Sequence, residues 1–183
     1  QAVQDVDRAV QEVRQAKRWA ARRGCSMVRV TPDTNVLGRG TISPHGAAGQ
    51  VLAAWVAGNV ALVTCAQIVE EYQDVLTRPH IRNRYRHVTP ATIAVSAAAL
   101  RHDAILVTLV DVPPVITKDP DDDVVLACAV SGGVDFIISG DPHVLGVKVY
   151  QGIPIVTAEA FLPILRGGVR EERATFAASG AAV

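Results

Sequence analysis

Eight of the eighteen acidic residues occur at four places in the sequence, each shortly after a predicted strand or at the start of a predicted helix. One follows the first apolar strand, two lie on the helix after the second strand, several open a later helix, and one follows a late strand. These acids are Asp33, Glu70, Glu71, Asp119, Asp121, Asp122, Asp123 and Asp141. Carboxylates brought together repel one another and raise one another's pKa unless a cation binds them. Their spacing therefore favours a metal site.

The residue types around these acids indicate which metal. Hard oxygen ligands without a nearby cysteine or histidine cluster favour Mg²⁺ or Mn²⁺ over zinc. Such ions can activate water against a phosphodiester and stabilise the leaving oxygen, so no histidine base is needed. The five histidines accordingly form no recognisable constellation.

Each acidic motif also has an ordinary structural interpretation. Asp33-Thr34-Asn35 is compatible with a turn or a helix cap, and Gly140-Asp141-Pro142 with a turn. Aspartates at residues 119–123 suit the positive end of a helix dipole. Only their common position at one sheet edge favours chemistry over these alternatives.

The predicted strands and helices place these acids at one edge of a sheet. Apolar strands are expected at residues 28–31, 60–64, 104–110, 135–139 and 153–156, and helices at 47–57, 67–76, 91–101, 120–131 and 158–165. Alternation of helices with strands that are apolar on both faces predicts a three-layer α/β/α sandwich around a mainly parallel central sheet. The carboxyl ends of its strands form the edge where ligands bind.

The 183 residues fit one domain with terminal extensions. Residues 1–26 form a predicted helical extension, because Val3, Val6, Val10 and Val13 repeat at helical spacing. Residues 27–165 form the predicted catalytic domain. Residues 166–183 are expected to be a flexible tail.

Composition excludes several classes of protein. A hydrophobic content of 49% excludes disorder over the whole chain, and no apolar run reaches the length of a membrane helix. Three scattered cysteines exclude a disulfide framework and favour a reducing compartment, the cytoplasm. Aromatic residues make up 4% of the chain, too few for single-strand binding by base stacking.

The net charge is zero, yet residues 78–87 contain four arginines, two histidines and no acid. These arginines, Arg78, Arg82, Arg84 and Arg86, are candidates for binding a phosphate backbone. A solvated helix end is an equally good interpretation.

Five segments together resemble the PIN-domain family, specifically the VapC-like toxins of toxin–antitoxin systems. In order they are VRVTPDTNVL (28–37), IVEEYQDVLTRP (68–79), KDPDDDVVLACA (118–129), DFIISGD (135–141) and GIPIVT (152–157). The resemblance runs from about residue 27 to residue 165. The sequence departs from the usual pattern of the family at Pro32, where an aliphatic residue is usual, and at Cys65, where serine is usual. Residues 1–26 have no counterpart.

The resemblance implies a function and a site. The function is that of a Mg²⁺- or Mn²⁺-dependent endoribonuclease that acts as the toxin of such a pair and leaves a 3′-hydroxyl and a 5′-phosphate. Four acids would bind the metal and carry catalysis: Asp33, Glu71, Asp122 and Asp141. Asn35, Ser139 and Asp123 would support them. Glu71 is preferred to Glu70 and Asp122 to Asp123, with both choices left open.

The expected partners are an RNA substrate and a cognate antitoxin protein; a homodimer is left open, and no membrane is expected. Two alternatives compete with the ribonuclease. One is a PIN scaffold that binds RNA or an antitoxin without catalysis. The other is a haloacid-dehalogenase-like phosphatase, which is disfavoured because that chemistry needs an acid where Asn35 stands.

Overall fold

The computed structural model describes residues 27–111 and 122–167. Its centre is a six-stranded sheet of order β3-β2-β1-β4-β6-β5. The strands are β1 (Val28–Pro32), β2 (Val60–Thr64), β3 (Ile105–Leu106), β4 (Phe136–Ile138), β5 (Val149–Tyr150) and β6 (Ile153–Val156). All neighbours pair in parallel except β5, which is antiparallel to β6.

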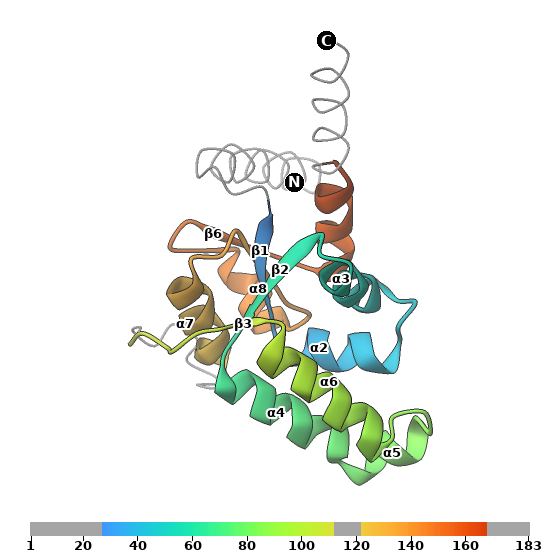
Figure 1. The fold of residues 1–183 in the computed structure, drawn as a ribbon. Helices are drawn as coiled ribbons and strands as arrows, with labels where there is room; N and C mark the ends of the chain where they lie inside the picture. Colours follow the sequence, from blue (N-terminus) through green and yellow to red (C-terminus); the bar gives the residue numbers. More distant parts are fainter. Residues whose placement is uncertain (1–26, 112–121, 168–183) are drawn as a thin grey trace, which may run out of the picture.

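Helices connect the strands and cover the sheet on both faces (Figure 1). They are α2 (Thr34–Ile42), α3 (Ala47–Val56), α4 (Ala66–Thr77), α5 (Pro79–Arg84), α6 (Pro90–His102), α7 (Asp122–Gly132) and α8 (Pro142–Val147), followed by helical residues 158–167. The predicted α/β/α sandwich with a mainly parallel sheet is thereby confirmed.

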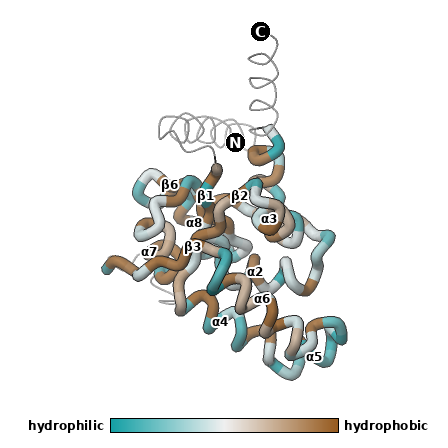
Figure 2. Tube along the Cα trace, viewed as in Figure 1, coloured by the Kyte–Doolittle hydropathy of each residue, from teal (hydrophilic) through white to brown (hydrophobic). Residues whose placement is uncertain are grey.

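Two hydrophobic cores hold the layers together. One contains the buried residues of α4, α6 and α7, among them Tyr72, Leu100 and Leu126. The other packs α3 and the last helix onto β1 and β4, where Phe136 and Phe161 meet edge to face at 5.5 Å. Hydrophobic residues accordingly concentrate on the strands, while hydrophilic residues gather around α5 (Figure 2).

The carboxyl edge of the sheet collects several chain segments. β1 ends at Pro32, and the Asp33 N–H donates to Ile138 O at 2.9 Å, which ties the end of β1 to the end of β4. α2 and α4 leave this edge after β1 and β2. α7 leads into the parallel strand β4, so its first residues also face this edge. The unusual Pro32 is thus accommodated at the last position of its strand.

The strand predicted over residues 104–110 is wrong in its extent. Only Ile105 and Leu106 pair with β2, and Val107 N–H donates the last bond to Thr64 O at 2.9 Å. The reason is that β2 ends at Thr64, so the later residues of the apolar run have no partner strand. Four helical or strand elements were also not predicted: α2, α5, α8 and β5.

Some predictions concern segments that the structure does not describe. The predicted helical extension at residues 1–26, residues 168–183 of the predicted tail, and the aspartates Asp119 and Asp121 all lie outside the described residues. Residues 166 and 167, which were assigned to that tail, belong to the last helix. In the described part of the chain, no helix combines the length and apolar character needed to cross a bilayer.

Candidate functional site

Asp33 lies at the centre of the candidate site and is 4% exposed. It is the N-cap of α2, and its Oδ1 accepts a hydrogen bond from the Val36 N–H at 2.6 Å. Its Oδ2 accepts from the hydroxyl of Ser139 and from the Gly140 N–H, the latter at 3.2 Å. The helix-cap interpretation of this motif is therefore correct. The same carboxylate is also buried at the carboxyl edge of the sheet.

The protonation of Asp33 reflects two opposing influences. Burial raises the pKa of its carboxyl above the ordinary value, and the nearby charge of Asp141 raises it further. Hydrogen bonds from Ser139, Val36 and Gly140 favour the ionised form and counter part of this shift. A buried carboxylate with a raised pKa beside a second acid favours binding of a cation.

Asp141 is joined to Asp33 through Ser139. The Asp141 N–H donates to the Ser139 Oγ at 3.0 Å, and that hydroxyl donates to Asp33. Asp141 caps α8, because its Oδ1 accepts from the His143 N–H at 2.7 Å. Its Oδ2 has no hydrogen-bond partner among the described residues, so it is available to a ligand.

Glu71 approaches the site from α4. Its Oε2 accepts a hydrogen bond from the Thr34 hydroxyl at 2.6 Å, and Thr34 directly follows Asp33. Glu70 lies instead where its charge acts on Cys65. Of the two neighbouring glutamates, Glu71 is the one connected to Asp33.

The acids of α7 are described only in part. Asp122 opens the helix, but its side chain lies outside what the structure describes. Asp123 follows it on the first turn and is half-buried. Within residues 27–111 and 122–167, no three cysteine, histidine or acidic side chains are close enough to form a metal-binding group. The structure thus links Asp33 to Asp141 through the Ser139 hydroxyl, binds Glu71 to Thr34, the residue after Asp33, and leaves the fourth acid undefined.

The donor set of this edge fits a hard divalent cation. Its groups are carboxylate oxygens, and Asp33 combines burial with a raised pKa, which a bound cation would reverse. In the described part of the chain, the side chains that hydrogen-bond to these acids are the hydroxyls of Thr34 and Ser139, which offer neither the nitrogen nor the sulfur of a zinc site. The oxygen-only chemistry matches Mg²⁺ or Mn²⁺.

The predicted supporting residues differ from one another in position. Ser139 is fully buried and links the two aspartates. Asn35 is exposed, and its side chain forms no hydrogen bond with the described residues. Sequence reasoning missed two contributors, Thr34 and Gly140. The sequence offered one signal for each: a hydroxyl residue adjoining the first acid, and a glycine between the linking serine and the last acid.

The arginine-rich segment lies beyond the far end of α4. Arg78 follows Glu71 by about two helical turns, roughly 10 Å along the axis. It pairs with Asp74 at 2.9 Å in an exposed salt bridge. Arg82, Arg84 and Arg86 are exposed, with the Arg84 guanidinium 5.7 Å from the ring of Tyr85. These three arginines form no ion pair with the described residues, so they present their charge to solvent around α5.

Two cysteines lie in the core near this edge. Cys65 is the N-cap residue of α4 and Cys128 lies on α7, and both are fully buried. The thiol of Cys128 and the backbone N–H groups at the start of α4 lower the pKa of Cys65 to about 7. Donation to Cys65 raises the pKa of Cys128. The pair thus connects the helices that carry Glu71 and Asp122.

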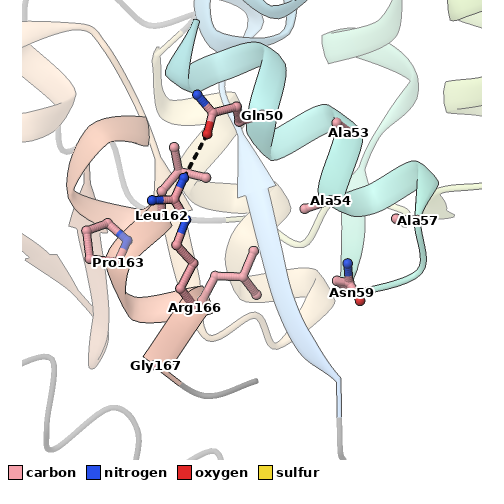
Figure 3. Close-up of a pocket in the computed structure, with 10 residues that line it drawn as sticks. Gln50, Ala53, Ala54, Ala57, Asn59, Leu162, Pro163, Arg166 and Gly167 are labelled. Atoms are coloured by element: carbon pink, nitrogen blue, oxygen red, sulfur yellow. Dashed lines mark hydrogen bonds between the residues drawn. The ribbon is translucent and has the colours of Figure 1, made fainter. Parts of the chain in front are cut away.

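Hollows elsewhere on the molecule have a different character. One of about 900 Å³ lies between α3 and the last helix, lined by small and apolar residues, with a hydrogen bond of 2.9 Å from Arg166 to Gln50 across it (Figure 3). It lies beside Asn59, at the amino end of β2. A second, of about 540 Å³, is lined mainly by apolar residues of α2, α3, α4 and α6, together with the hydroxyl groups of Thr41, Thr92 and Ser96. In neither does a described residue contribute a carboxylate to the lining.

Comparison with known families gives one result. A PIN domain model matches residues 29–143, more than half of the chain, and the match includes Asp33, Glu71, Asp122 and Asp141. Comparisons with curated proteins and with solved structures gave no match. PIN domains are generally nucleases. The match and the fold agree with the resemblance seen in the sequence, and the chain belongs to the PIN-domain family.

Proposed function

We propose that this chain is a divalent-metal-dependent endoribonuclease and the toxin of a toxin–antitoxin pair. The observation that carries the proposal is the buried Asp33, linked to Asp141 through Ser139 and to Glu71 through Thr34. A carboxylate buried beside a like charge is unfavourable without a function that uses it. Binding a cation is such a function.

Asp33, Glu71, Asp122 and Asp141 would hold Mg²⁺ or Mn²⁺. Bound there, one or two such ions would supply an activated water and stabilise the charge that develops on the phosphodiester. Membership of a nuclease family supports this assignment.

The protein groups around the acids fix their orientation. Ser139 and the Gly140 N–H hold the Oδ2 of Asp33, and the start of α2 holds its Oδ1. Thr34 orients Glu71, while Asp141 is fixed through one oxygen and leaves the other open to a ligand. These contacts keep the carboxylates in place before any ligand binds, which lowers the cost of binding.

Arg82, Arg84 and Arg86 would bind the RNA backbone outside the acidic site. Their exposure and their lack of acidic neighbours within residues 78–87 support this role. The proposal also includes a cognate antitoxin, a homodimer and a cytoplasmic location.

The test is RNA cleavage by the purified protein in Mg²⁺ or Mn²⁺, with EDTA as a control. We expect cleavage to require the metal and to be abolished in Asp141→Asn, whose side chain keeps its size and its cap to His143. Lys148→Gln is a matched control, because it removes one exposed charge shortly after α8.

Other outcomes would assign other functions. Hydrolysis of a small phosphate ester without RNA cleavage would indicate the phosphatase. RNA binding without cleavage in any divalent metal would indicate the non-catalytic scaffold. Full cleavage by Asp141→Asn would contradict the proposed site.

A further inference from the structure

Arg39 is a cationic residue at the acidic site that the sequence analysis did not consider. It lies on α2, whose N-cap is Asp33. Its guanidinium lies against the backbone of Gly140: a Cβ atom at Gly140 would stand 3.3 Å from the Arg39 Nη1 and 3.7 Å from its Cζ. Gly140 donates to Asp33 and precedes Asp141. Arg39 therefore lies beside the residue that connects the two linked acids.

This guanidinium is not neutralised by the described part of the protein. Arg39 is exposed and forms no hydrogen bond or ion pair with the described residues. Three other surface arginines have partners: Arg78 pairs with Asp74, Arg101 donates to Gln73, and Arg166 donates to Gln50. The exposed arginines around α5 share the lack of an ion pair but lie far along α4 from the acids. The guanidinium of Arg39 lies beside Gly140 and, unlike those of Arg78, Arg101 and Arg166, remains open to a ligand.

The chemistry of Arg39 suits one kind of ligand. A planar guanidinium with five N–H donors matches the oxygens of a phosphate in a bidentate arrangement. An RNA phosphate approaching Asp33 and Asp141 meets like charge, and a cation at the rim offsets that repulsion. The absence of a side chain at Gly140 leaves the space in which this cation lies.

We propose that Arg39 binds the RNA phosphate located at the acidic site and thereby positions the bond to be cleaved. The inference rests on the proposed ribonuclease function and adds a substrate contact separate from the arginine-rich segment around α5. Gly140 is part of the same arrangement, because a side chain at this position would meet the guanidinium.

The test measures binding of a single-stranded RNA in EDTA over a series of KCl concentrations, so that no cleavage occurs. Arg39→Ala should weaken binding about tenfold at low salt and lower the slope of log affinity against log salt by roughly 0.7, the value for one phosphate contact. Arg39→Lys should keep the slope and bind more weakly than the wild type, since it retains the charge and loses the planar fork.

Two further variants separate this contact from general charge. Arg166→Ala removes an exposed arginine beside the amino end of β2, and should leave the slope at the wild-type value. Gly140→Ala places a methyl group against the guanidinium and should weaken binding in the same direction as Arg39→Ala.

An unchanged affinity and slope in Arg39→Ala would overturn the inference, as would a slope change of equal size in Arg166→Ala. Failure of the proposed function appears differently. In that case the wild type does not cleave RNA in Mg²⁺ or Mn²⁺, whereas an error about Arg39 alone leaves cleavage by the wild type intact.

Discussion

Replacing Asp33 separates its role in the fold from its role in binding a cation. In EDTA, Asp33→Ala removes the cap bond to Val36, which typically contributes about 1 kcal/mol to the free energy of unfolding. It also leaves the Gly140 N–H without its acceptor, at a further cost of about 1 kcal/mol. Removal of an unfavourably buried charge offsets part of this destabilisation. We expect the free energy of unfolding to fall by about 1–2 kcal/mol in all.

Asp33→Asn should be less harmful. The amide oxygen retains the cap to Val36, while the amide nitrogen faces the Gly140 N–H and cannot accept from it. With the buried charge gone, we expect this variant to be about 1 kcal/mol more stable than Asp33→Ala. Urea unfolding followed by far-UV circular dichroism measures the difference, and equal stabilities for the two variants would refute the cap as the structural role of Asp33.

The pH dependence provides a second check on the same residue. Because the pKa of Asp33 is raised in the folded state, folding binds a proton there, so stability falls as the pH rises from about 4 through the raised pKa. Asp33→Asn should lack this fall. If the free energy of unfolding changes with pH by the same amount in the wild type and in Asp33→Asn, Asp33 does not titrate as described.

Three other predictions address the metal, the arginines and the core. Mn²⁺ at 100 times its Kd should stabilise the wild type by about 2.7 kcal/mol, and a melting temperature indifferent to Mn²⁺ would contradict a folded-state metal site. Replacing Arg82, Arg84 and Arg86 together by alanine should weaken the binding of all RNA sequences alike. The slope of log affinity against log salt concentration should fall by roughly 0.7 for each phosphate that is no longer bound. Cleavage should recover at high RNA concentration. Wild-type affinity and slope in this triple variant would show that the segment does not bind RNA. Gly132→Ala would bring a Cβ within 2.4 Å of the Val63 Cγ1 and should cost about 1–3 kcal/mol in urea unfolding, whereas an unchanged midpoint would show that the core yields there.

The sheet and its order along the chain were largely predictable because its strands are short apolar runs bounded by turn residues. β2 begins and ends at the predicted residues, and β1 differs by one residue. α2 was not predicted, since Gly38, Gly40 and Thr41 have low helix propensity. Its Asp33 cap and the burial of the apolar side chains on its first turn hold it in place. The cap is a local contact that the motif allowed, whereas the burial depends on tertiary packing that a single sequence does not reveal.

The sequence predicted where in the fold the acidic residues of the candidate site lie, but not which residues contact them. Strand ends placed Asp33 and Asp141 at one edge, as the parallel sheet requires. The hydroxyl of Thr34, the peptide of Gly140 and the guanidinium of Arg39 come together only in three dimensions. Arg39 in particular follows Asp33 closely in sequence, yet its role depends on a neighbour beyond the end of β4.

The double role of Asp33 affects how inactive descendants of this domain would evolve. Glu71 is exposed and has one hydrogen bond to the described residues, so its replacement would remove the proposed activity at little cost to folding. Asp33 starts α2 and ties it to the end of β4, so its replacement damages folding even where cleavage is no longer selected. A copy that has abandoned nuclease activity should therefore change at Glu71 before it changes at Asp33. An aspartate retained at this position in such a copy indicates an intact helix start, and the identity of the residue at the Glu71 position is the better indicator of activity.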